Sequence, residues 1–130
     1  MKKFETAFNK IEELAHGNAV VKGFWEDGDN RNRGELLALV HAEVSEALEG
    51  HRKGKHSTNE QIIKAVQIED DSKFKEFMEL NIKDTYENEL ADVFIRMFDI
   101  SGGEHINMLA HINAKMRYNE MRGWKHGKKY

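Results

Sequence analysis

The spacing of the apolar residues constrains this chain most, because they recur every three or four residues in several separate segments. Between residues 4 and 15 the pattern is formed by Phe4, Phe8, Ile11, Leu14 and Ala15. A helix turns about 100° per residue, so this spacing places the apolar side chains on one helical face. Proline, which breaks helix interiors, is absent from the 130 residues. We therefore expect an all-α fold.

Glycines and capping residues divide the remaining chain into further helices. The first helix is expected to stop near Gly17, with a loop over residues 17–34. A second helix begins near Asn32 or Gly34 and ends near Gly50. Two more helices are expected over 86–101 and 104–122, ending at the glycines that follow them. These segments predict a bundle of about four main helices, with antiparallel neighbours where the loops are short.

Residues 58–82 form an expected helical insert between the second and third main helices. A capping signal through Ser57 and Glu60 opens its first helix. The acidic run at 69–71 interrupts the apolar pattern, and a second short helix follows. The length of the chain suits one domain over residues 1–130, with a basic tail at 124–130.

Charge and composition exclude several classes of protein. The net charge of −3 argues against a protein that coats nucleic acid, since that role needs a basic face. No apolar run is long enough for a signal peptide or a membrane span. We therefore expect no nucleic-acid partner, no membrane association and a cytoplasmic location. The sequence has no cysteine, which excludes disulfides and thiol chemistry.

One carboxylate lies in the middle of an apolar helix face in the segment LLALVHAEVSEALEG, residues 36–50. With Leu36 at 0°, Val40 and Ala47 fall at about 40° and 20°, and Glu43 falls at about 340°. Glu46 falls at about 280°, at the edge of the apolar arc. A buried carboxylate without a partner is costly, so it shifts its pKa, forms an ion pair or binds a metal.

A second acidic pair, Glu89 and Asp92, borders the apolar face of the segment 86–101. If the two helices pack antiparallel, these residues can face Glu43 and Glu46, and four clustered carboxylates require a cation between them. Oxygen ligands of this kind suit Mg²⁺ or Mn²⁺. The alternative is structural: Arg96 lies one turn beyond Asp92 and can pair with it, and Glu43 can form a buried ion pair with a lysine or arginine.

The text around these acids resembles the MazG-like nucleotide pyrophosphohydrolases of the all-α NTP pyrophosphatase superfamily. The signature of that family is ExxE on one helix and ExxD on the next, here Glu43-x-x-Glu46 and Glu89-x-x-Asp92. The flanking stretches ALVHAEVSEALE, ELADVFIR, KMRYNEMR and KHGKK are more specific than the bare acidic spacing. The resemblance covers most of the chain from about residue 20.

The resemblance implies a reaction and a set of site residues. Members hydrolyse nucleoside triphosphates, NTP or dNTP, to the monophosphate and pyrophosphate, using Mg²⁺ or Mn²⁺ to activate water for attack between the α- and β-phosphates. By this resemblance the four acids are the catalytic metal ligands. The KMxxNxxR pattern makes Lys115, Asn119 and Arg122 the substrate-binding residues, and Trp25 a candidate to stack on the base. For Trp25 the alternative is core packing. For Lys115, Asn119 and Arg122 the alternative is a solvated polar face near a helix C-terminus.

Several alternatives stay open at this level. The stretch between the two acidic motifs is longer than the family usually has, so the insert is a candidate lid, base pocket or oligomer interface. The resemblance also implies a homo-oligomer, either a dimer or a tetramer. The seven histidines form no HExxH motif and no tight ligand cluster in sequence, so zinc is not favoured. The competing function is a helical module that senses nucleotide or metal without hydrolysis. The preferred base and sugar are not readable.

Overall fold

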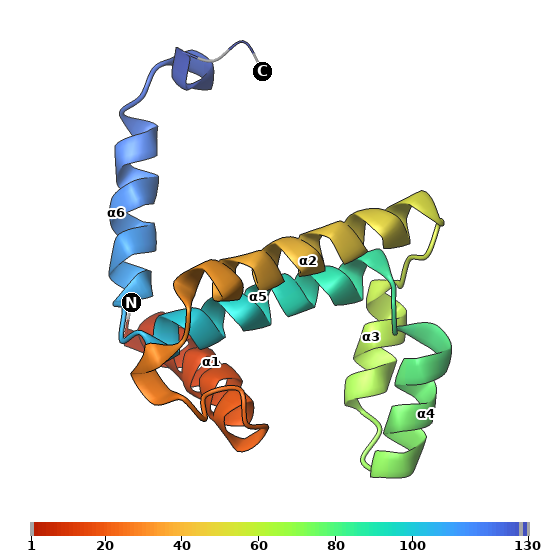
Figure 1. Cartoon of the computed structure of the whole chain (residues 1–130). Helices are drawn as coiled ribbons and strands as arrows, with labels where there is room; N and C mark the ends of the chain where they lie inside the picture. Colours follow the sequence, from red (N-terminus) through yellow and green to blue (C-terminus); the bar gives the residue numbers. More distant parts are fainter. Residues whose placement is uncertain (1, 128, 130) are drawn as a thin grey trace. The chain divides into compact units, whose positions relative to one another are not determined.

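The computed structural model describes residues 2–127 and 129, and within that part of the chain it contains α- and 3-10 helices but no strand (Figure 1). The all-α expectation is confirmed. In chain order the elements are α1 (Lys2–Val21), η1 (Gly28–Asn30), α2 (Arg33–Arg52), α3 (Asn59–Val66), α4 (Asp71–Asn81), α5 (Tyr86–Gly103), α6 (Met108–Glu120) and η2 (Trp124–Gly127). No helix in these residues is both long and apolar enough to cross a membrane.

The chain divides into two compact units. The central unit comprises residues 30–97, and the terminal unit combines residues up to 29 with those from 98 onward. The central unit contains α2, α3, α4 and most of α5, whereas the terminal unit contains α1 and α6. The single domain over 1–130 and the four-helix bundle, which would join helices of both units, stay predictions.

The first two helices test the boundary signals directly. Asn32 caps α2, and its side chain accepts a hydrogen bond from the backbone N–H of Glu35, as its position predicted. The expected stop at Gly17 is wrong, because α1 continues to Val21. An interior glycine costs only about 1 kcal/mol relative to alanine, and the apolar pattern of α1 outweighs that cost. Gly50 likewise lies inside α2 rather than at its end.

Two short helices, α3 and α4, lie where the sequence predicted them, with the cap of the first one residue later than expected. Thr58 and Gln61 form the capping box of α3, each side chain bonding the other's backbone N–H. The pair Ser57 and Glu60 is therefore not the cap, and Ser57 instead donates its backbone N–H to Glu87 at 2.8 Å. Asp70 caps α4 and so explains why the acidic run separates the two helices.

The ends of the last two helices also differ from the sequence expectation. Helix α5 includes both Gly102 and Gly103, and the hydroxyl of Thr85 accepts a hydrogen bond from Asn88 N–H at its start. Helix α6 begins at Met108 rather than near residue 104, with Asn107 as its cap, and ends at Glu120. In the basic tail, η2 covers Trp124–Gly127, and Lys128 lies outside the described residues.

Helices α2 and α5 lie side by side and antiparallel within the central unit (Figure 1). The C-terminal part of α2 meets the start of α5, where a Cβ on Gly50 would lie 3.0 Å from the backbone nitrogen of Tyr86. Half-way along α2, Glu43 contacts Arg96 of α5. Glycine at position 50 therefore permits the close approach that sets the register of the two helices.

Helix α5 turns its acidic side inward and much of its apolar side outward. Glu89 is only 6% exposed, whereas Phe94 is 65% exposed. The sequence placed Phe94 with Leu90 at the centre of the apolar face, and Glu89 at its border. The face that contacts α2 is therefore the border face with the acids, which leaves apolar side chains accessible on both helices.

Candidate functional site

Helices α2 and α5 bring the predicted acidic residues together within the central unit. One carboxylate oxygen from each of Glu43, Glu46 and Glu89 lies within 4.8 Å of the other two. Glu43 and Glu89 are buried, at 9% and 6% exposure, while Glu46 lies at the exposed edge. The two helices lie antiparallel, which is the condition under which the sequence predicted that the acidic motifs can face each other (Figure 1).

The fourth acid, Asp92, lies one turn beyond Glu89 on the same helix and is half-buried. Burial raises the pKa of Asp92, the charge of Glu43 raises it further, and the neighbouring Arg96 guanidinium offsets part of this rise. Burial also raises the pKa of Glu89, and the charges of Asp92 and Glu46 add to that effect. Both carboxylates are therefore held in a site that resists their ionisation.

Arg96 is the counter-ion within this cluster. Its Nε donates to Oε1 of Glu43 at 2.6 Å, with the arginine side chain 32% exposed and the glutamate side chain 11% exposed. The structural alternative for Glu43, a buried ion pair with arginine, is thus present. If the four acids of the cluster are all ionised, Arg96 compensates one of their negative charges. Among these five side chains, three negative charges remain uncompensated.

The donor set fits a hard divalent cation. Carboxylate oxygens are the ligands that Mg²⁺ and Mn²⁺ prefer, and three of them converge here from two helices. Glu43, Glu46 and Glu89 are placed to share an ion, with Asp92 next to them. A cation at this position would relieve the repulsion that raises the pKa values of Glu89 and Asp92.

A pocket of about 200 Å³ opens beside the acids in the same unit. Glu46 and Glu89 line it, and so do Lys53 and Lys55 from the turn after α2. Lys53 pairs with Glu49 at 3.0 Å. This volume is below that of common small-molecule pockets, so it suits a cation with a phosphate group rather than a whole nucleotide. Sequence reasoning missed Lys55, because nothing in HRKGKH indicated that the turn folds back toward the acids.

Of the predicted phosphate-binding residues in the terminal unit, Lys115 and Asn119 lie on α6, whereas Arg122 lies two residues beyond the end of that helix. Lys115 Nζ lies 5.1 Å from the ring centre of Tyr118, and the Arg122 guanidinium lies 6.0 Å from the same ring. Asn119 carries a buried side-chain oxygen that has no hydrogen-bond partner among the described residues. Tyr118 is 57% exposed between the two cations and is a candidate for base stacking. Its place in KMRYNEMR, three residues after the lysine, was the available signal.

Trp25 belongs to a polar network in the terminal unit. Its indole N–H donates to Oδ1 of Asp99 at 2.8 Å, and Nδ1 of His16 lies 2.9 Å from the same oxygen. A Cβ on Gly103 would lie 2.3 Å from the indole, so only glycine leaves room for the ring. Trp25 is half-buried, so part of its side chain packs against neighbouring residues and part remains accessible. Its predicted role as a base-stacking residue stays a prediction.

Comparison with known proteins returns no match: no protein-family model, no curated protein and no solved structure is similar to this chain. The acidic cluster and its surroundings, together with the motif resemblance, are the features that point to a function.

Proposed function

We propose that this protein is a metal-dependent nucleoside triphosphate pyrophosphohydrolase with a MazG-like fold. The carrying observation is the convergence of Glu43, Glu46 and Glu89, whose carboxylate oxygens lie within 4.8 Å of one another. The raised pKa values of Glu89 and Asp92 support a site that accepts positive charge. The choice of reaction, hydrolysis to the monophosphate and pyrophosphate, follows the resemblance of the ExxE and ExxD motifs.

Glu43, Glu46, Glu89 and Asp92 would hold the ion, Mg²⁺ or Mn²⁺. Such an ion would neutralise part of the triphosphate charge. It would also lower the pKa of a bound water, which makes water a better nucleophile at neutral pH. Arg96 orients Glu43 through its hydrogen bond and so restrains one ligand. Glu46 is the exposed member of the cluster, so it is the carboxylate best placed to accept a proton from an attacking water.

Cationic side chains would bind the phosphates. Lys55 lines the pocket that Glu46 and Glu89 also line, so it is our candidate for the phosphate nearest the ion. Lys115 and Asn119 are four residues apart on one face of α6, and Arg122 follows just after the helix ends. The unsatisfied oxygen of Asn119 supports a role in accepting a hydrogen bond from the substrate. Tyr118 and Trp25 are the aromatic candidates for the base.

We propose further that the protein forms a homo-oligomer. On α2, Leu37, Val44 and Leu48 are about half exposed and recur at spacings that form one stripe. On α5, Phe94 and Met97 are exposed by 65% and 38%. Apolar stripes on both helices of one unit suit burial against a second copy. Light scattering coupled to size exclusion would distinguish monomer, dimer and tetramer.

The competing function is a nucleotide- or metal-sensing module without hydrolysis. One observation favours it: the 2.6 Å contact between Arg96 and Glu43 gives the buried carboxylate a structural partner that needs no ion. In that case nucleotide would bind and stabilise the protein, but pyrophosphate would not be released.

The decisive experiment measures pyrophosphate and monophosphate release from a panel of NTPs and dNTPs, with Mg²⁺, with Mn²⁺ and with EDTA. We expect metal-dependent release that falls by about 100-fold or more in Glu46→Gln, the loss typical of a catalytic group. Glu35→Gln, an exposed acid in the first turn of the same helix, is the matched control and should retain activity. Nucleotide binding without release by the folded, metal-loaded protein would establish the sensing module instead.

A further inference from the structure

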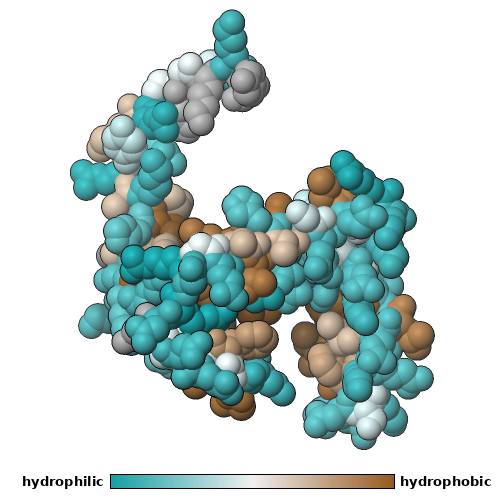
Figure 2. Space-filling view, in the orientation of Figure 1, coloured by the Kyte–Doolittle hydropathy of each residue, from teal (hydrophilic) through white to brown (hydrophobic). Residues whose placement is uncertain are grey.

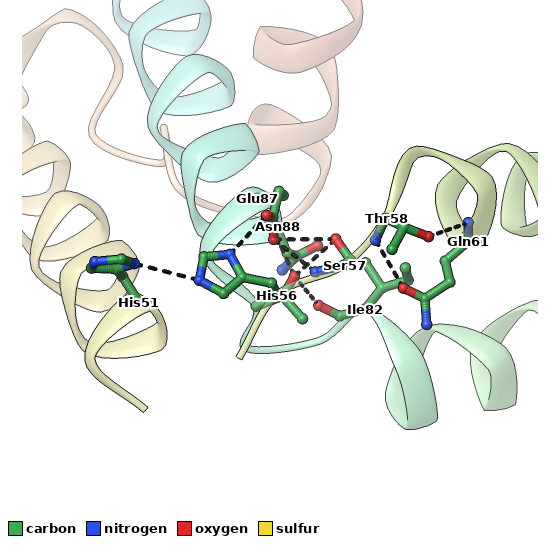
Figure 3. Close-up of polar contacts among 9 residues, drawn as sticks. His51, His56, Ser57, Thr58, Gln61, Ile82, Glu87 and Asn88 are labelled. Carbon is green, nitrogen blue, oxygen red and sulfur yellow. Dashed lines mark hydrogen bonds and ion pairs between the residues drawn. The ribbon is translucent and has the colours of Figure 1, made fainter. Parts of the chain in front are cut away.

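Two histidines that are five residues apart in sequence come together at the end of α2. Nδ1 of His51 lies 3.4 Å from Nε2 of His56, and the two ring centres are 5.5 Å apart (Figure 3). Both side chains are exposed. Figure 3 shows His51, His56 and Glu87 in a row, with His56 between the other two.

The backbone around this pair is restrained by specific hydrogen bonds. Gly54 adopts a φ of +68°, a conformation that glycine accepts easily, and so reverses the chain after α2. Lys55 N–H then donates to Gly50 carbonyl oxygen at 2.9 Å, and Tyr86 N–H donates to Lys55 carbonyl oxygen at 2.9 Å. The residue before His56 is thereby tied to both α2 and α5. The fold therefore brings the backbone positions of the two histidines together.

Glu87 fixes the orientation of the His56 ring. Its Oε1 lies 2.9 Å from Nδ1 of His56, while its Oε2 accepts the backbone N–H of Ser57 at 2.8 Å. A carboxylate accepts hydrogen bonds, so Nδ1 of neutral His56 carries the proton and Nε2 carries the lone pair. That lone pair is on the side of His51. A carboxylate that holds the far nitrogen of a histidine in this way is the arrangement found behind metal-ligating imidazoles.

The separation of the two nitrogens matches a shared ion. Two imidazole nitrogens bound to one tetrahedral Zn²⁺ at about 2.0–2.1 Å are about 3.3–3.4 Å apart. The observed 3.4 Å is long for a hydrogen bond, whose usual N···O distance is about 2.9–3.0 Å. With the lone pair on Nε2 of His56, the proton of this contact belongs to Nδ1 of His51. Moving that proton to the other ring nitrogen of His51 and turning its exposed ring would direct both lone pairs to one point.

We propose that His51 and His56 form a binding site for a borderline divalent transition-metal ion such as Zn²⁺, with Glu87 as the positioning residue behind His56. Imidazole nitrogen selects zinc, nickel and copper over Mg²⁺ and Ca²⁺, which prefer oxygen. The site therefore differs in chemistry from the acidic cluster. Glu87 and Glu89 are two residues apart on α5, so their side chains lie on different sides of the helix.

The protein supplies two ligands, and the remaining coordination positions are open. Among the described residues, the only group of three or more acidic, histidine or cysteine ligands that converge on one point is the one formed by Glu43, Glu46 and Glu89. Water or a ligand from solution would therefore complete the coordination of an ion held by His51 and His56. Such a site binds more weakly than a closed structural zinc site, and it ties the end of α2 to the turn before α3.

Zinc titration of the full chain, prepared without a histidine tag and freed of metal, tests this site by isothermal titration calorimetry. Co²⁺ serves as a spectroscopic probe, because its visible bands report nitrogen ligation in a four-coordinate site. With excess Mg²⁺ present in every titration to occupy the acidic cluster, we expect one saturable Zn²⁺ per chain that survives in Glu46→Gln and His41→Gln. His41 is an exposed histidine on the same helix and is the matched control.

The variants His51→Gln and His56→Gln should each abolish saturable Zn²⁺ binding, and Glu87→Gln should weaken it by about 10- to 100-fold. Circular dichroism of each variant would establish that the fold is retained. Imidazole nitrogen chemical shifts in the wild-type chain provide a readout that does not depend on a variant, since Zn²⁺ should move the signals of His51 and His56. The proposal is overturned if the wild-type chain fails to bind Zn²⁺, if both histidine variants bind it unchanged, or if Glu46→Gln alone abolishes binding.

Discussion

Replacing Glu89 by glutamine should stabilise the metal-free protein, although it alters a proposed ligand. The side chain is 6% exposed and close to three other carboxylates. Two unit charges 4.8 Å apart repel by about 1 kcal/mol in water and by about 3.5 kcal/mol at an effective dielectric constant of 20. Glutamine keeps the shape and an acceptor oxygen while it removes this repulsion. We expect a gain in the free energy of unfolding of about 1–3 kcal/mol at neutral pH, or about 4 °C in Tm for each kcal/mol.

The pH dependence of this gain identifies its cause. Because the pKa of Glu89 is raised in the folded state, the folded chain binds the proton more tightly than the unfolded chain does. Wild-type stability therefore falls as pH rises from the ordinary value of 4.5 through the raised pKa of the folded state. The advantage of Glu89→Gln should be smallest at pH 4 and larger at pH 7.5.

Thermal unfolding followed by circular dichroism, in EDTA and at low ionic strength, measures both quantities. Adding Mg²⁺ should raise the Tm of the wild-type chain more than that of Glu89→Gln, because the variant has lost a ligand. Glu76→Gln, which removes an exposed carboxylate on α4, is the control and should change the Tm little at either pH. A less stable Glu89→Gln at pH 7.5 in EDTA would refute the reasoning, as would an equal advantage at both pH values.

Three other substitutions test separate parts of the central unit, and a fourth, at Gly17 in α1 of the terminal unit, serves as a comparison for Gly50. Arg96→Gln leaves Glu43 without its counter-ion and should lower the free energy of unfolding in EDTA by about 1–3 kcal/mol, with part of the loss recovered in Mg²⁺; urea titration measures both. Gly50→Ala forces a Cβ within 3.0 Å of Tyr86 backbone nitrogen and should cost about 1–3 kcal/mol. Gly17→Ala, where nothing lies within 4 Å, should instead stabilise α1 by about 0.5–1 kcal/mol, and a matching loss there would contradict the packing argument. Lys55→Ala should reduce kcat/KM for triphosphates by about 10-fold with little change in Tm, and unaltered kinetics would remove this lysine from the site.

Local signals in the sequence predicted most helix starts within a few residues. Asn32 caps α2 because a short polar side chain satisfies the first free N–H groups wherever the chain begins to coil. The predicted helix end at Gly17 is wrong because a glycine only weakens a helix. The apolar pattern of α1 outweighs that cost, so the helix continues. At the insert, Ser57 and Thr58 are both capping residues in sequence. Thr58 is the N-cap of α3, because Ser57 instead donates its backbone N–H to Glu87, 30 residues away in sequence.

The acidic cluster likewise has one feature that the local sequence predicted and one that it did not. Periodicity alone placed Glu43 in an apolar arc, and it is buried there. The partner of Glu43 was not predictable: Arg96 is four residues from Asp92 in sequence, yet it pairs with Glu43 because the antiparallel register brings the two side chains together.

The sequence by itself determined the helices and the residue types that can bind a hard cation, since caps and periodicity depend on neighbours within a few positions. Tertiary structure decided which face of α5 turns toward α2, because that choice depends on the close contact at Gly50 and on the pairing of Arg96 with Glu43. It also decided that His51 and His56 meet, because the turn between them is held by Tyr86 from α5. Contacts between distant segments have no local signal, so only the folded chain reveals them.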